Sequence, residues 1–158
     1  MLLHELGHAL VGRWQGFQWL TVGPFRWSNE ADQVRFRWNT DLHTAGGMVL
    51  SVLTDDRDLR HRYLAFAAGG PLASLVWAAL ALGSYVLLPI ALRAQLLGIS
   101  LRMTGTVSLV IAVLTLVPLQ FGSFASDGAQ MLTMWRGGPA SQLETVVLAA
   151  VGRSVAGT

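Results

Sequence analysis

The residues best suited to chemistry stand at the start of the chain, in the sequence His4-Glu5-Leu6-Gly7-His8. Two histidines four positions apart lie on one face of a helix, so both imidazoles can reach one Zn²⁺ ion. The glutamate beside the first histidine is placed to act as the general base that activates a water molecule. The surrounding helix is apolar, and ionisable side chains at membrane depth are costly and usually functional. We therefore predict that His4 and His8 bind zinc and that Glu5 is catalytic.

A third protein ligand is expected, because two histidines leave room for one more side chain and a water molecule. The chain has no cysteine, so this ligand must be a histidine, an aspartate or a glutamate. We favour Asp127, which follows the last long apolar stretch. Glu30 is the alternative, because soluble zinc peptidases often recruit a downstream glutamate, but it lies in a polar turn that leads into a predicted strand. His43 and His61 are predicted to be surface or interfacial residues.

The composition points to a membrane protein. Of the 158 residues, 53% are hydrophobic and 13% are charged, which is roughly half the charge of an average soluble domain. This balance excludes a disordered, coiled-coil or collagen-like chain. All eleven basic residues are arginines, scattered among the acidic residues. Nucleic acid is therefore excluded as a partner, because its binding requires an uninterrupted basic face, and the lipid bilayer is the expected surrounding.

Two uncharged stretches are long enough to cross a bilayer, residues 63–92 and residues 103–122, with a connector at 93–102. Residues 1–16 form a third apolar helix of only about 24 Å, so we expect the chain to begin within a transmembrane helix. Residues 123–158 hold Asp127 and a partial helix at 142–156, and both ends are expected to be cut. The prediction is a single mainly α core of three transmembrane helices, the first truncated.

The polar segment 17–62, between the first and second helices, has a different pattern. Residues 34–38 alternate apolar and basic side chains, as a half-exposed strand does. Residues 22–27 are the expected hairpin partner, with a turn at 28–33, and residues 46–50 are predicted to form another short extended piece. We expect a small membrane-associated β-hairpin here.

Three motifs, in this order, resemble the site-2 protease family of intramembrane zinc metalloproteases. His4 to His8 resembles the first family motif. Residues 68–74, Ala-Gly-Gly-Pro-Leu-Ala-Ser, resemble its central Gly-Pro motif, in which asparagine commonly stands at the position of Ser74. Ser126-Asp127-Gly128 resembles the Asp-Gly motif whose aspartate completes the zinc site. Residues 46–49 also look like the membrane-associated hairpin region of the family.

The sequence departs from the family pattern at its third motif. The family usually has Asn-Pro closely followed by Leu-Asp-Gly-Gly, whereas here Val117 precedes Pro118, the gap to Asp127 is longer, and Ala129 replaces the second glycine. The missing asparagine affects how a substrate would be positioned rather than the metal ligands. The short connector at 93–102 leaves no room for the PDZ domains that some relatives insert there.

The resemblance implies a multi-pass protein of the cell membrane that hydrolyses peptide bonds in or near transmembrane segments of membrane protein substrates. It implies Zn²⁺ bound by His4, His8 and Asp127, and a substrate-binding space shaped by Gly70, Pro71 and Ser74. The active site is expected towards the cytoplasmic side, because six arginines lie in 17–62 and only Arg93 and Arg102 lie between the two long stretches.

Two alternatives to this function remain open. One is a catalytically inactive membrane scaffold that keeps the fold and binds a partner helix, and the altered Asp-Gly motif favours it. The complete His-Glu-His motif argues against it, because Glu5 has no evident purpose without hydrolysis. The other is a zinc peptidase that uses Glu30 as its third ligand.

Overall fold

The computed structural model is mainly helical, as the sequence predicts. It describes residues 1–16, 19–22, 25–30, 33–38, 58–122 and 124–138, and also Val146. The predicted extended piece at 46–50, His43 and, apart from Val146, the predicted helix at 142–156 lie outside the described residues. The helices are α1 (Leu2–Trp14), α2 (Leu59–Leu87), α3 (Ile90–Arg93), α4 (Leu96–Leu116) and α5 (Asp127–Arg136).

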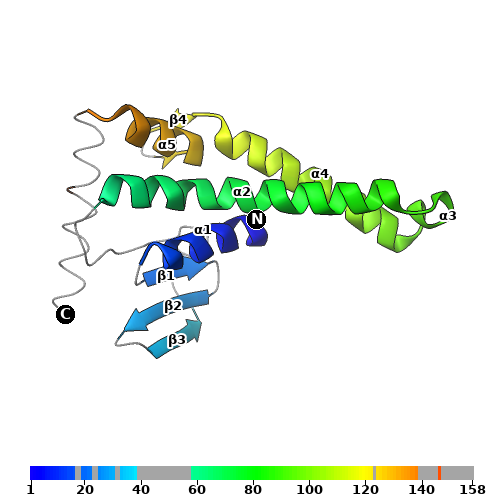
Figure 1. The fold of residues 1–158 in the computed structure, drawn as a ribbon, viewed down its shortest axis with the longest axis horizontal. Coiled ribbons are helices and arrows are strands. Elements are labelled where there is room, and N and C mark those ends of the chain that lie inside the picture. Colours follow the sequence, from blue (N-terminus) through cyan, green and yellow to red (C-terminus); the bar gives the residue numbers. More distant parts are fainter. Residues whose placement is uncertain are drawn as a thin grey trace.

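The long helix α2 is the centre of the arrangement, with α1 along one side, α5 along the other, and α4 crossing α2 obliquely (Figure 1). The backbones of α1 and α2 come very close where Gly7 faces Gly69. A Cβ atom on Gly7 would lie 2.3 Å from the Gly69 carbonyl oxygen, and one on Gly69 would lie 2.7 Å from the Gly7 carbonyl oxygen. Small residues permit this kind of close helix crossing in membrane proteins. The crossing fixes α1 against the middle of the first half of α2.

Two helices, α2 and α4, are long and apolar enough to cross a membrane. Their bounds differ from the predicted stretches. Helix α2 begins earlier than predicted, at Leu59, and ends at Leu87 because the backbone turns extended at Leu88, before Pro89. Helix α4 begins at Leu96, so most of the predicted connector, including Arg102, is helical, and it ends at Leu116, before Pro118.

The joint between α2 and α4 contains the short helix α3 at the far end of the molecule (Figure 1). Arg93 closes this joint by donating hydrogen bonds from Nε to the Leu88 carbonyl (3.0 Å) and from Nη2 to the Val86 carbonyl (2.6 Å). Farther along, Gly105 of α4 lies against Leu82 of α2. The two helices therefore form a long antiparallel hairpin.

The chain turns back after α4 to begin α5 beside the first half of α2. The strands β4 (Gln120–Phe121) and β5 (Phe124–Ala125) pair in this turn. Ser126 caps α5, because its Oγ accepts a hydrogen bond from the Ala129 amide (3.2 Å). The same oxygen donates to the Val117 carbonyl (2.7 Å) and accepts from the Leu119 amide (3.0 Å). One side chain thus ties the end of α4 to the start of α5.

A three-stranded antiparallel sheet lies beside α1, on the side away from α2 (Figure 1). Its strands, in the order β1-β2-β3, are β1 (Trp19–Val22), β2 (Phe25–Glu30) and β3 (Gln33–Trp38). The register pairs Phe25 with Trp38 and Glu30 with Gln33. The strands occupy the region in which the alternating sequence predicts a hairpin, and they extend into the segment 28–33 that the prediction assigned to a turn.

The burial pattern of α1 is the reverse of that of a helix in a water-soluble protein. Its polar side chains His4, Glu5 and His8 are buried, whereas Leu2 and Leu10 are 63% and 57% exposed. A helix on the surface of a soluble domain places its apolar stripe inward and its charged residues outward. The exposed leucines of α1 therefore suit an apolar surrounding.

Candidate metal centre

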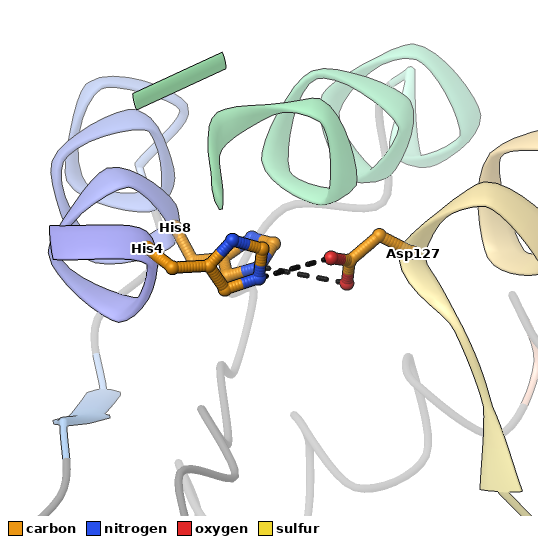
Figure 2. Close-up of side chains that lie close together, drawn as sticks. All are labelled: His4, His8 and Asp127. Atoms are coloured by element: carbon orange, nitrogen blue, oxygen red, sulfur yellow. Dashed lines mark hydrogen bonds and ion pairs between the residues drawn. The ribbon is translucent and has the colours of Figure 1, made fainter. Parts of the chain in front are cut away.

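Two imidazoles and one carboxylate meet beside α2, as Figure 2 shows. His4 and His8 extend from successive turns of α1, and Asp127 is the first residue of α5. His4 Nε2 lies 3.2 Å from His8 Nε2 and 3.1 Å from Asp127 Oδ2, and His8 Nε2 lies 3.5 Å from Asp127 Oδ1. The structure thus brings together three residues that span most of the chain, as the sequence predicts for a metal site.

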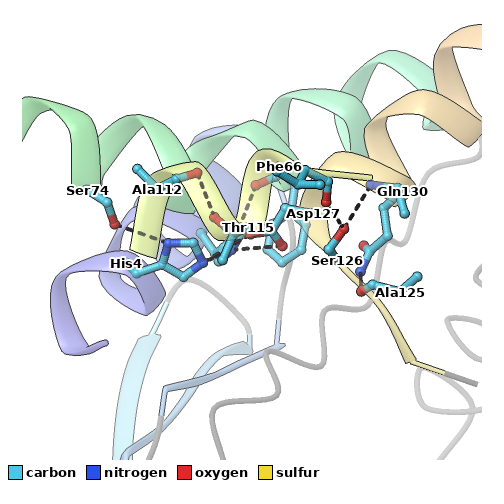
Figure 3. Close-up of polar contacts among 12 residues, drawn as sticks. His4, Phe66, Ser74, Ala112, Thr115, Ala125, Ser126, Asp127 and Gln130 are labelled. Carbon is cyan, nitrogen blue, oxygen red and sulfur yellow. Dashed lines mark hydrogen bonds and ion pairs between the residues drawn. The ribbon is translucent and has the colours of Figure 1, made fainter. Parts of the chain in front are cut away.

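The helix α2 orients both histidines through their Nδ1 atoms, and Figure 3 shows the contact of His4 with Ser74. His8 Nδ1 lies 2.8 Å from the Phe66 carbonyl oxygen, and His4 Nδ1 lies 3.1 Å from Ser74 Oγ. A carbonyl oxygen only accepts hydrogen bonds, so the proton between His8 and Phe66 must be on Nδ1. The Nε2 atom of a neutral His8 then has a free lone pair directed at His4 and Asp127. Metal-binding histidines usually have their second ring nitrogen fixed in this way.

The separations of these atoms fit a bound divalent cation. Tetrahedral coordination with bonds of about 2.0 to 2.1 Å places neighbouring ligand atoms about 3.3 Å apart. The shortest distances here are 3.1 to 3.5 Å, and the two that involve Asp127 use its two different carboxylate oxygens. Taken as one ligand atom from each residue, the three atoms lie within 4.8 Å of one another. The Nε2 atoms of the two imidazoles face each other at 3.2 Å, and a cation or a proton between them can be shared by both nitrogens. The residues present can therefore hold a metal ion through two nitrogens and one carboxylate.

Glycine at position 70 makes the space for the His8 ring. A Cβ atom on Gly70 would lie 2.2 Å from His8 Nε2 and 2.7 Å from two of the ring carbons. The next residue, Pro71, is fully buried inside α2 and lacks the amide that would bond to the Ala67 carbonyl. The predicted substrate-binding residues Gly70, Pro71 and Ser74 thus lie on the α2 face beside the histidines. Their direct contact with a substrate stays a prediction.

The position of Asp127 depends on its neighbours Ser126 and Gly128. Ser126 fixes the first turn of α5 through the hydrogen bonds described above. A Cβ atom on Gly128 would lie 2.0 Å from the Leu116 carbonyl oxygen, so only glycine lets α5 approach the end of α4 this closely. The aspartate side chain consequently extends from a fixed helix start towards α1 (Figure 2).

The charge state of Asp127 follows from its partners. Burial alone would raise the pKa of Asp127, but hydrogen bonds from His4 and His8, together with their positive charge, outweigh burial. The net pKa of this carboxyl group lies below its ordinary value of 3.8. The group is therefore ionised at neutral pH, which is the form that binds metal ions.

Glu5 follows the first histidine and is also buried, with 9% of its surface exposed. It is near enough to His4, His8 and Asp127 to feel the charge of each. A buried glutamate beside two imidazoles and a carboxylate is placed to exchange a proton with a molecule bound among them.

Of the other candidate residues, His61 lies at the surface. The side chain of His61 is 78% exposed and pairs with Asp58 at 3.2 Å, as expected for a surface residue. Glu30 is the last residue of β2, and its side chain is outside the described part of the chain. The Phe66 contact could not be predicted from the sequence, because it uses a backbone carbonyl group that any residue would supply.

An apolar cavity of about 330 Å³ lies next to the start of α5. Leu64 of α2, Leu116 of α4, and Gly128 and Trp135 of α5 are among the residues that line it. The cavity therefore adjoins the turn of α5 that carries Asp127.

Comparisons of the chain with protein-family models, with curated proteins and with solved structures found no match.

Proposed function

We propose that this protein is a membrane-embedded zinc metalloendopeptidase that cleaves peptide bonds in or near transmembrane segments of other proteins. The observation that carries the proposal is the convergence of His4, His8 and Asp127, whose ligand atoms, one from each residue, lie within 4.8 Å of one another, beside the buried Glu5. The resemblance of three sequence motifs to the site-2 protease family points to the same activity.

The chain supplies each group that peptide hydrolysis by this route requires. His4, His8 and Asp127 would hold zinc, which when bound polarises the scissile carbonyl group and lowers the pKa of water. Glu5 accepts the proton from the attacking water and returns it to the leaving amine. Ser74 and the Phe66 carbonyl group keep both imidazoles in the orientation that exposes Nε2. Two nitrogens and one oxygen are ligands that suit zinc.

The proposed location is the cell membrane, with several crossings. Helices α2 and α4 are long and apolar enough to span it, and the exposed leucines of α1 suit lipid or a neighbouring membrane helix. We propose that α1 belongs to a third crossing. The arginine distribution then favours an active site towards the cytoplasmic side.

The proposed substrates are membrane proteins. A transmembrane helix must unwind locally before hydrolysis, because its carbonyl groups are otherwise hydrogen-bonded within the helix. The sheet β1-β2-β3, which lies beside α1, offers edge strands to which an unwound segment can pair. The apolar cavity at the start of α5 suits the apolar side chains of such a segment.

The decisive experiment replaces Glu5 with glutamine in the purified chain in phospholipid nanodiscs. Zinc content is measured by elemental analysis, and cleavage is measured with a panel of fluorogenic peptides, each carrying one transmembrane segment. We expect Glu5→Gln to retain one zinc ion per chain and to lose cleavage by at least about 1,000-fold, since the residue acts on protons rather than on the metal. Glu30→Gln is the matched control and should retain both zinc and cleavage.

The other outcomes identify the rival functions. Cleavage at the wild-type rate by Glu5→Gln would refute the assignment of the general base. Stoichiometric zinc without cleavage of any peptide by the wild type would favour the scaffold. Loss of zinc in Glu30→Gln and its retention in Asp127→Ala would favour the peptidase that uses Glu30.

A further inference from the structure

The first turns of α2 carry two arginines that contact the ends of the two ligand-bearing helices. Arg60 donates from Nε to the Met134 carbonyl and from Nη2 to the Trp135 carbonyl, both at 2.5 Å, at the end of α5. Arg62 donates from Nε to the Gln15 carbonyl at 2.7 Å, and also from Nη2 to the same oxygen, at the end of α1. One short segment of α2 thus binds the C-termini of α1 and α5.

These contacts match what a helix end needs. The last carbonyl groups of a helix lack partners within the helix, and they carry partial negative charge. An arginine guanidinium group satisfies both conditions, because it is planar, permanently charged and has several donors.

A glycine with positive φ follows the end of each helix, Gly16 (80°) after α1 and Gly137 (67°) after α5. A Cβ atom on Gly16 would lie 2.6 Å from the Arg62 guanidinium group, and one on Gly137 would lie 3.6 Å from that of Arg60. At Gly16 the absence of a side chain is therefore what lets the guanidinium group reach the helix end.

The metal ligands precede these arginine contacts along the same two helices. His8 is seven residues before Gln15, and Asp127 is seven residues before Met134, so each ligand is about 10 Å from its arginine contact. A tilt of about 6° at the arginine end would move a ligand by about 1 Å over that length. Metal–ligand distances tolerate only about 0.2 Å.

We infer that Arg60 and Arg62 are positioning residues, which clamp the ends of α5 and α1 to α2 and thereby set the distance between Asp127 and the two histidines. The inference rests on the proposed metal centre and not on proteolysis. Other contacts hold each helix as well, namely Ser74 with His4 on α1 and Tyr63 with Gln130 on α5. The two arginines restrain the C-terminal ends of α1 and α5, which lie farther from those contacts.

The test measures metal affinity in the purified chain in nanodiscs. Zn²⁺ affinity is obtained by competition with a chelator, and Co²⁺ is used as a spectroscopic probe of the ligand geometry. Arg60→Ala and Arg62→Ala should each lower Zn²⁺ affinity by about 10-fold or more and change the Co²⁺ absorption spectrum, as loss of outer-sphere support does at other metal sites. Arg62→Lys, which keeps the charge but loses the planar pair of donors, should recover part of the affinity.

The double variant separates a clamp from two independent stabilising contacts. Removal of one arginine contact already allows the distance between α1 and α5 to vary. The double variant Arg60→Ala with Arg62→Ala should therefore lower Zn²⁺ affinity little more than the more severe single variant does. Independent effects would instead multiply. Arg93→Ala is the matched control, because Arg93 also binds carbonyl groups at a helix end, Val86 and Leu88, but at the far end of α2. It should leave Zn²⁺ affinity and the Co²⁺ spectrum unchanged.

Three results would overturn the inference. They are wild-type affinity in both single variants, multiplicative losses in the double variant, and an equal loss in Arg93→Ala. A wild-type chain that binds neither Zn²⁺ nor Co²⁺ would refute the metal centre itself, and the clamp with it. A chain that binds zinc without cleaving peptides would refute only the proteolytic function.

Discussion

The helices α2 and α4 have similar apolar compositions, yet their surroundings differ. In the most apolar 18-residue stretch of each, 44% of α2 but only 17% of α4 is buried inside the molecule. Helix α2 contacts α1, α4 and α5, and it supplies both groups that orient the histidines. Helix α4 contacts mainly α2 and presents Met103, Val107 and Val110 outward. Hydropathy therefore detects both helices but does not distinguish the one that builds the site.

The larger number of buried small residues, and the buried polar residue Ser74, distinguish α2 from α4. The buried positions of α2 include Gly69, Gly70, Ser74 and two further alanines at 78 and 81. Those of α4 are limited, in the described chain, to Gly98, Gly105 and Ala112. Small side chains allow backbones to approach closely, which is what holds membrane helices together in the absence of a hydrophobic driving force between them. A cluster of glycine and serine in an apolar stretch thus indicates the face that contacts protein.

The largest effect is expected at the α2 face beside His8. Gly70→Ala places a Cβ atom 2.2 Å from His8 Nε2, so the ring must leave the position in which it faces His4 and Asp127. We expect Zn²⁺ affinity to fall by more than about 100-fold in chelator competition, beyond the loss caused by an outer-sphere change. Gly83→Ala, on the same helix with no atom within 4 Å of the added methyl group, is the control and should bind Zn²⁺ normally. Normal binding by Gly70→Ala would disprove the described position of His8.

A charge on α4 should have the next largest effect, and it tests the outward-facing surface. Val107 is 55% exposed near the middle of α4, and Leu97 is 58% exposed in its first turn. In a bilayer, Val107→Lys should make the insertion of α4 about 3 kcal/mol less favourable than in the wild type. Leu97→Lys should cost much less, because a lysine near a helix end extends to the interface.

Translocon-mediated insertion of α4 with reporter glycosylation sites measures both variants. If lysine at position 107 and lysine at position 97 raised the free energy of insertion by equal, small amounts, α4 would face water instead of lipid. The difference in surroundings between α4 and α2 would then not hold.

Much of this site could be predicted from sequence, because its parts follow local rules. His4 and His8 are four residues apart in one helix, and Asp127 follows an apolar stretch and precedes a glycine. The predicted helix bounds were less accurate, because each helix was assumed to end at the nearest charged residue. Arg62 lies within α2 although it is charged, and its guanidinium group binds the Gln15 carbonyl group at the end of α1. Pro89 ends α2 although no charged residue precedes Arg93 there. The Phe66 contact and the arginine clamp depend on distant backbone groups, which leave no pattern in the chain.

The smallest effect concerns pH, and it depends on the way α2 orients the imidazoles. With Nδ1 held by Ser74 and Phe66, protons and metal compete for the same Nε2 atoms, because an imidazole must be neutral to bind a metal ion. Zn²⁺ affinity should therefore fall as the pH is lowered from 7.5 to 5.5, by up to about 10-fold per pH unit for each histidine. Asp127 adds nothing in this interval, because its pKa lies below 3.8.

The contribution of Asp127 belongs to a lower pH window. Its folded-state pKa is depressed, so the ionised carboxylate stabilises the fold above about pH 3.8, and this stabilisation is lost as the pH falls through the folded-state pKa. Thermal unfolding of the metal-free chain at pH 3 to 7 should show this loss in the wild type and a smaller one in Asp127→Asn. An affinity for Zn²⁺ that is constant from pH 7.5 to 5.5 would mean that the imidazoles are not the ligands. The contacts of α2 with Nδ1 would then serve packing alone, and the difference between α2 and α4 would be one of burial rather than of chemistry.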